Sequence, residues 1–220
     1  MATEPSDPGR ELRDRVKVWS SVGSGVDFEE DELTLMPTDA LRLEHRVIER
    51  VMRILEARSM SINQGEGVDR VFAHRVVDFL SVYADRVHHG KEEEILFREL
   101  DDCALSAEHR RMMEELVREH VEMRRLTAEL RSAVAGWPEG GEEALNKLSE
   151  PIGALTNTYP THMRREEEEF FPVISSYLGQ EDLLAVLDTM AAHDRAMIHE
   201  KYGGLADEWE GNLEQWDSLE

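Results

Sequence analysis

Two segments of the chain pair a histidine with a glutamate four residues later, as His88 with Glu92 and His162 with Glu166. On a helix this spacing places the imidazole and the carboxylate one turn apart on the same face, where both can reach a single ion. Imidazole nitrogen combined with carboxylate oxygen suits iron, manganese or zinc. One such pair on an acidic helix is a weak sign, but two pairs in matching sequence contexts predict a metal site.

Two further histidines, His45 and His120, stand inside rows of apolar residues that recur every three or four positions. Such periodicity places each row on one helix face, the face that a bundle buries. The apolar neighbours are Leu41, Ile48, Met52 and Leu55 for His45, and Met113, Leu116, Met123 and Leu130 for His120. A core histidine hydrogen-bonded to a backbone or carboxylate oxygen is the alternative interpretation. Burying several unpaired imidazoles and carboxylates would cost on the order of several kcal/mol, so we favour metal ligands.

An internal repeat connects these segments. Residues 41–55 align with residues 116–130, including the histidine of each. The segment HHGKEEEILF, starting at His88, aligns with HMRREEEEFF, starting at His162, and the two alignments keep the same separation to within one residue. Two unrelated segments with one spacing indicate a duplicated helical hairpin. Two amphipathic hairpins bury their apolar faces by packing together, so the sequence predicts an all-α, up-down four-helix bundle.

The helical pattern divides the chain into three parts. We expect a partly irregular N-terminal arm at residues 1–36, the bundle at 37–180, and a C-terminal helix with an acidic tail at 181–220. Pro160 lies inside the fourth helix of the bundle and removes one backbone donor. We therefore expect a kink or a short irregular turn just before His162.

The composition limits the partners and the compartment. The formal net charge of −23 would repel phosphate backbones and anionic lipid headgroups, so we expect neither nucleic acid nor membrane as a partner. The sequence has no apolar signal-peptide core at its start and no stretch near the ~18 apolar residues of a membrane span. The single cysteine, Cys103, rules out an intramolecular disulfide framework and a Cys-rich zinc site. We expect a cytoplasmic protein.

The segments LRLEH and HHGKEEEILF, followed by EHVEMR and HMRREEEEFFP, resemble the hemerythrin-like HHE cation-binding family. The resemblance covers about residues 38–178. It implies a pair of non-haem iron ions, with manganese or a mixed iron–manganese pair as the alternative. It also implies that the two glutamates bridge the ions, together with an oxo or hydroxo bridge. The implied ligands are His45, His88, Glu92, His120, His162 and Glu166.

The sequence departs from that family in one respect. Many members have five histidine ligands, and the fifth has no obvious counterpart here. The alternatives for completing that ion are water, Glu66 from the irregular connection after the first helix, or Tyr159. If none of these binds, one coordination position stays open.

The phase of the second helix leaves a further choice. Under α-helical periodicity, His89 and Glu93 align better than His88 and Glu92 with the apolar residues of this helix. Those residues are Phe79, Val82, Leu96 and Leu100. The match to the second copy of the repeat favours His88 and Glu92, and we give the repeat more weight.

These features predict a non-haem di-iron protein that binds or reacts with O2, peroxide or nitric oxide. Its role would be oxygen binding or sensing, detoxification or iron-centre repair, and we expect binding or sensing rather than turnover. The alternative is a metal- or redox-responsive regulatory module that contacts a protein partner through the C-terminal helix and tail, which contain Trp209 and Trp216. That helix is expected over about Gln180–Tyr202, with His193 and His199 on a solvated surface rather than in a second site.

Overall fold

The structure of the chain is a computed structural model that describes residues 36–63, 69–136, 142–174 and 176–194, followed by His199 and residues 202–207 and 209–210. Regular structure in these residues is helical, with no strand. The expected N-terminal arm, Glu66 and Trp216 lie outside the described residues. None of the described helices combines the length and the apolarity needed to cross a membrane.

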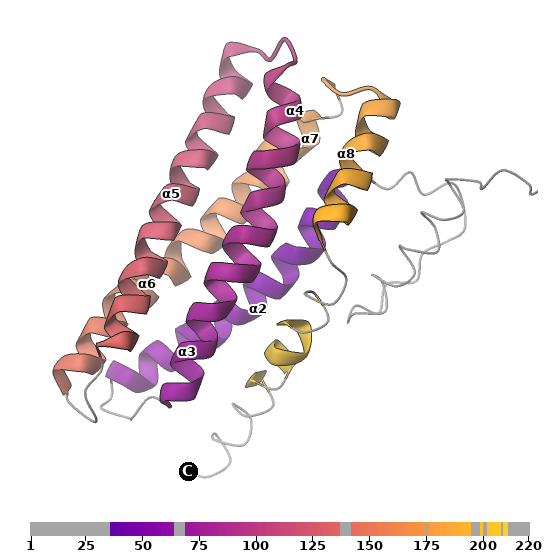
Figure 1. Ribbon diagram of the computed structural model, residues 1–220. Coiled ribbons are helices and arrows are strands. Elements are labelled where there is room, and N and C mark those ends of the chain that lie inside the picture. The colour runs from indigo at the N-terminus through magenta and orange to yellow at the C-terminus, as the bar shows by residue number, and fades with distance from the viewer. Residues whose placement is uncertain are drawn as a thin grey trace, which may run out of the picture.

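Four long helical rods form the core of the molecule (Figure 1). The first rod is α2 (Pro37–Asn63) and the third is α5 (Ala107–Ala135). The α5 helix is capped at its N-terminus by Ser106, whose Oγ accepts a hydrogen bond from the His109 N–H at 3.1 Å. This cap satisfies a backbone donor that the first helical turn leaves without a partner.

The second and fourth rods each contain π-helical segments, in which backbone bonds join residues five apart. The second rod is continuous through α3 (Arg70–Phe79), η1 (Leu80–His89), η2 (Glu92–Phe97) and α4 (Arg98–Asp101). The fourth rod is continuous through α6 (Glu142–Arg165), η3 (Glu166–Phe170) and α7 (Phe171–Ile174). The α6 helix packs against α2 and α5, and α5 packs in turn against α3 and η1. The all-α bundle predicted from the repeat is confirmed.

Two details of the fourth and fifth helices differ from the expectation. The α6 helix stays helical through both Pro151 and Pro160 and has no irregular turn before His162. The following helix, α8 (Gln180–His193), ends well before Tyr202, because Asp194 adopts extended backbone angles (φ −91°, ψ 96°). The Asp194 side chain is buried and accepts a hydrogen bond from Lys91 at 3.0 Å, which ties the chain to the second rod at this point.

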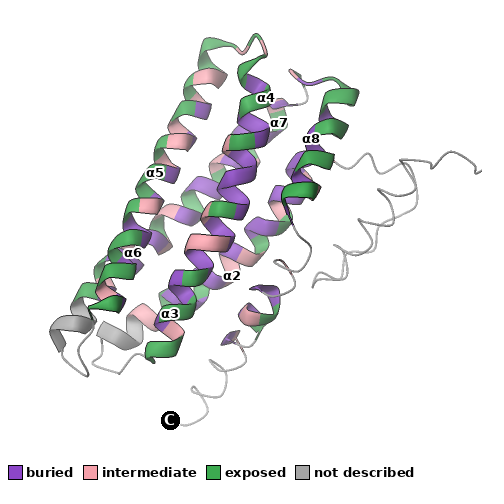
Figure 2. Cartoon of the chain, viewed as in Figure 1, coloured by how far each residue is buried: buried purple, intermediate pink, exposed green. Residues whose placement is uncertain are grey.

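The interior is apolar at both ends of the bundle and polar in the middle. Along α2, Leu41 belongs to one apolar cluster and Ile48 to the other, and the buried His45 separates them. Figure 2 shows the buried residues along the inward faces of the rods. The segment after the bundle adds to both clusters, since Met190 of α8 joins one and Trp209 joins the other. The C-terminal segment is therefore part of the packed structure.

We expect Leu55→Ala to lower the free energy of unfolding by about 2 to 5 kcal/mol, because Leu55 is fully buried and its loss leaves a cavity. Chemical denaturation measures this change. The matched control is Leu184→Ala on α8, where 42% of the side chain is exposed and the expected change is within about 0.5 kcal/mol. Equal effects of the two substitutions would contradict the described packing.

Candidate metal centre

A layer of fully buried polar side chains crosses the middle of the bundle, and every rod contributes to it. Each of these side chains is no more than 1% exposed. They are His45 of α2, His88, His89 and Glu92 of the second rod, His120 of α5, and His162 and Glu166 of the fourth rod. The structure thus brings together all six residues predicted from the sequence, and it adds His89.

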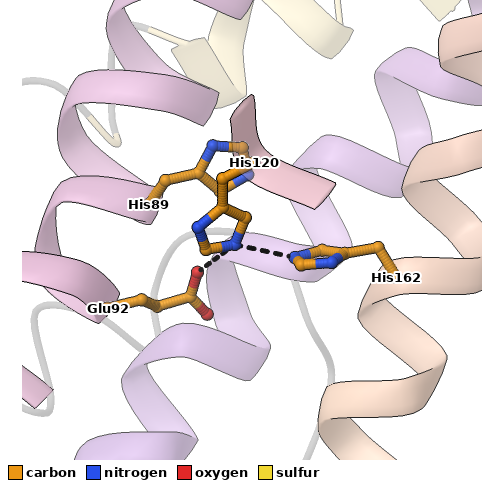
Figure 3. A group of neighbouring side chains, drawn as sticks. All are labelled: His89, Glu92, His120 and His162. Carbon is orange, nitrogen blue, oxygen red and sulfur yellow. Dashed lines mark hydrogen bonds and ion pairs between the residues drawn. The ribbon is translucent and has the colours of Figure 1, made fainter. Parts of the chain in front are cut away.

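These residues form two groups, and the candidate ligand atoms within each group lie within 4.8 Å of one another. The first group, shown in Figure 3, consists of His89, Glu92, His120 and His162. The second consists of His45, His88, Glu92 and Glu166. Because Glu92 belongs to both groups, the two positions adjoin each other.

The spacing of the ring nitrogens fits shared ions. The Nε2 atoms of His120 and His162 are 3.0 Å apart, and those of His45 and His88 are 3.1 Å apart. Two nitrogens at right angles about one ion, each ~2.1 Å from it, would lie ~3.0 Å apart. Each pair of nitrogens is therefore placed as two ligands of one ion would be.

The two glutamates span the two groups, with one oxygen directed to each. Glu166 Oε1 is 3.2 Å from Nε2 of His162, and its Oε2 is 3.2 Å from Nε2 of His45. Glu92 Oε2 is 3.3 Å from Nε2 of His120, and its Oε1 is 3.6 Å from Nε2 of His88. None of the four oxygens has a hydrogen-bond partner among the described residues. Buried carboxylates without donors are costly, and bridged cations would remove that cost.

A carboxylate contacts the outer nitrogen, Nδ1, of four of the rings at 2.6 to 2.8 Å. A neutral imidazole that donates its Nδ1–H in this way keeps the Nε2 lone pair free for a metal, and the partner fixes the orientation of the ring. The pairs are His45 with Glu167, His88 with Glu44, His120 with Glu93, and His162 with Glu119.

Each of these outer carboxylates is also bonded to a cationic side chain. Arg124 donates to Glu93 at 2.8 Å, and Arg165 donates to Glu119 at 2.5 Å. Arg46 donates to Glu167, and Lys91 donates to Glu44. The cations keep the carboxylates ionised. For Glu44, burial alone would raise the pKa, but Lys91 and His88 outweigh it and lower the pKa to about 2.

His89 provides a fifth buried histidine, whereas the sequence pattern indicated it only as an alternative to His88. Its ring is fully buried and stacks on His120 with centroids 4.0 Å apart, and on Tyr159 at 5.9 Å. Burial and the neighbouring histidines lower its pKa well below the ordinary value, which leaves it neutral and able to bind a metal. In the repeat alignment His89 matches Met163, so the repeat does not predict a ligand at this position.

The π-helical geometry resolves the choice between the two phases of the second helix. The wider turn lets the adjacent His88 and His89 both face the interior. Glu92 lies in the buried layer, as the repeat indicated, whereas Glu93 is partly exposed and holds the Nδ1 of His120. In a regular α-helix the two pairs would be mutually exclusive, because adjacent residues point about 100° apart.

A surface cleft lies beside the second group, between α2 and α6. Its volume is about 220 Å³, and its lining includes His45, Pro160, Met163 and Glu167. No part of this lining comes from the second rod or from α5. The cleft therefore approaches the centre on the side of the His45–His88 pair.

A bundle with buried histidine and glutamate side chains from all four rods has the construction of a metal-binding helical protein. The Hemerythrin HHE cation binding domain family matches residues 36–174, and a second match covers residues 111–219. The first match spans more than half of the chain, so the chain belongs to this family. Comparisons with curated proteins and with solved structures found no match.

The stability of the metal-free protein should depend on pH through His45. Burial disfavours its charged form, but Glu166 and Glu167 outweigh this and raise the pKa to about 9. Because the folded-state pKa is raised, His45 stabilises the fold fully below its unfolded pKa of about 6.5, and this contribution is lost as pH rises through about 9. Urea denaturation should give a lower free energy of unfolding at pH 9 than at pH 6.5. A His45→Gln variant with the same pH dependence would contradict this account.

Proposed function

We propose that this protein is a non-haem di-iron protein that binds O2, peroxide or nitric oxide at one coordination position not filled by a side chain. The observation that carries the proposal is the convergence of buried Nε2 atoms and glutamate oxygens that lack hydrogen-bond donors. Manganese or a mixed pair uses the same donors and is the alternative metal content. The first ion would take His89, His120 and His162, the second would take His45 and His88, and both would share Glu92 and Glu166.

The two ions would differ in the number of protein ligands. His89 belongs only to the first group, and the second repeat has Met163 at the matching position. Met163 is buried and lines the cleft together with His45. The second ion would thus have one ligand fewer, on the side from which a small molecule can approach.

The chain would control access and the environment of this position. Phe97 stacks near His120 with centroids 6.2 Å apart, and Phe171 stacks near His45 at 5.8 Å. These rings and the two apolar clusters keep water away from the polar layer. When bound, ferrous iron would supply the electrons for binding O2, peroxide or nitric oxide. The protein itself orients the ligands through the outer carboxylates and limits access to the cleft.

Metal analysis and absorption spectroscopy test this proposal. Protein reconstituted anaerobically with ferrous iron should hold about two ions per chain, and its spectrum should change on exposure to O2, peroxide or nitric oxide. Glu92→Gln should weaken both ions because Glu92 belongs to both groups. His74→Gln, an exposed histidine on the same rod, is the matched control and should behave as wild type. Absence of tightly held metal in the wild type would contradict the proposal.

The repeat also offers a test of the open position. Met163→His would give the second ion the ligand that His89 gives the first, and should abolish nitric oxide binding by the reduced protein while both irons are retained. Met163→Leu, which keeps an apolar side chain of similar size, should bind nitric oxide as wild type does. Unchanged nitric oxide binding in Met163→His would place the open position elsewhere.

A regulatory role is the second candidate. The supporting observation is that Asp194 and His199, which follow α8, contact Glu44 or its partner Lys91 beside the metal centre. Trp209 is only 4% exposed, so a partner could reach it only after the C-terminal segment is released. This role requires that metal change the docking of that segment, since a ligand stabilises the state that it binds.

A further inference from the structure

A second buried polar cluster lies behind His88, where the C-terminal segment meets the second rod. Lys91 is fully buried and donates to both Glu44 and Asp194. The Nε2 of His199 lies against the Asp194 carboxylate and 3.3 Å from Glu44 Oε1. The Nδ1 of His199 is 2.8 Å from the Tyr83 hydroxyl. We call Glu44, Lys91, Asp194 and His199 the Lys91 cluster.

The Lys91 cluster is connected to the metal centre through the carboxylate of Glu44. Glu44 Oε2 accepts from Nδ1 of His88 at 2.8 Å, and Glu44 Oε1 accepts from Lys91. The position of Lys91 therefore fixes the carboxylate that fixes the His88 ring. Asp194 holds Lys91 from the opposite side, so two residues beyond the bundle take part in this chain of contacts.

The second repeat supports its equivalent histidine without such help. There, Glu119 accepts from Nδ1 of His162, and Arg165 donates to Glu119 and to Glu115. Arg165 matches Lys91 in the repeat alignment. The Arg165 and Glu119 side chains are 30% and 31% exposed, whereas Lys91, Glu44 and Asp194 are fully enclosed. Support for His162 comes from within the bundle, and support for His88 includes the C-terminal segment.

The composition of the Lys91 cluster favours a support network over a third metal site. Glu44, Asp194 and His199 are close enough to hold an ion. However, the Lys91 ammonium already contacts both carboxylates, and its positive charge would repel a metal cation placed between them. Burial lowers the pKa of His199 to about 4, so its ring is neutral and adds no competing charge. A buried cation shared by two carboxylates is a favourable arrangement only while every member remains in place.

We propose that Lys91, Asp194 and His199 are positioning residues for His88, so that the C-terminal segment determines how tightly the ion of the His45–His88 group is held. The proposal rests on the proposed metal centre. The ion of the His89–His120–His162 group does not depend on this network, because the outer partners of that group lie within the bundle. The chain thus holds its two ions by different means.

The experiment uses the full-length protein and measures the affinity of each ferrous ion by anaerobic competition with a chelator. Asp194→Ala removes the acceptor of Lys91, and His199→Phe keeps a ring beside Tyr83 but removes the contact with Asp194. Loss of an outer partner typically costs 10- to 100-fold in metal affinity, so we expect about a tenfold loss for one ion. The other ion should keep the wild-type affinity. Glu181→Gln, at an exposed position of α8, is the matched control and should change neither ion.

The outcomes separate the positioning role from the metal centre itself. Wild-type protein without bound iron would overturn the proposed function and this inference with it. If both variants bind both ions with wild-type affinity, the positioning role is overturned and the metal centre stands. Equal loss of affinity for both ions would also overturn the positioning role. If Asp194→Ala fails to fold in thermal unfolding, Asp194→Asn keeps the shape of the side chain. The absorption spectrum of the iron-bound Asp194→Asn protein should differ from that of the wild type through one of the two ions. A spectrum and an affinity equal to those of the wild type would contradict the positioning role.

Discussion

The fold depends on keeping imidazoles and ionised carboxylates together in the middle of an apolar bundle. Each of four rings directs Nε2 inward only because a carboxylate holds its Nδ1, and each such carboxylate is balanced by an arginine or a lysine. Without these outer pairs the rings would be free to turn, and the interior would contain polar atoms in no fixed arrangement. The π-helical geometry places His89 in this layer, and the C-terminal segment packs behind the layer, where Asp194 contacts Lys91.

The two halves of the bundle have the same construction but differ at two matching positions. The first copy of the repeat has His89 and Lys91, where the second has Met163 and Arg165. His89 gives the group of His120 and His162 an additional nitrogen, which Met163 does not give the other group. Arg165 forms a partly exposed ion pair with Glu119, whereas Lys91 is buried and also contacts Asp194. A symmetric duplication would give two equivalent sites, whereas in the proposed centre these differences would leave the position beside His45 and His88 more open and more dependent on the C-terminal segment.

Much of this arrangement could be predicted from the sequence, because it follows from regular helical spacing. The repeat located His45, His88, Glu92, His120, His162 and Glu166, and the structure brings all six into one layer. His89 could not be found in this way, since an α-helix does not turn two adjacent residues equally toward one interior. The prediction of a solvated surface was wrong for His199, which is largely buried beside Asp194. Nothing in the local sequence indicates that contact, because its partners come from distant parts of the chain.

In the proposed centre, the buried layer holds two bridged metal ions. Anomalous X-ray diffraction at the iron absorption edge, from crystals of the iron-loaded protein, tests it most directly. We predict two anomalous peaks inside the bundle, one among His89, His120 and His162 and the other beside His45 and His88, with Glu92 and Glu166 in contact with both. Iron-loaded crystals with no peak in this layer, or with a peak only at Glu44, Asp194 and His199, would contradict the account.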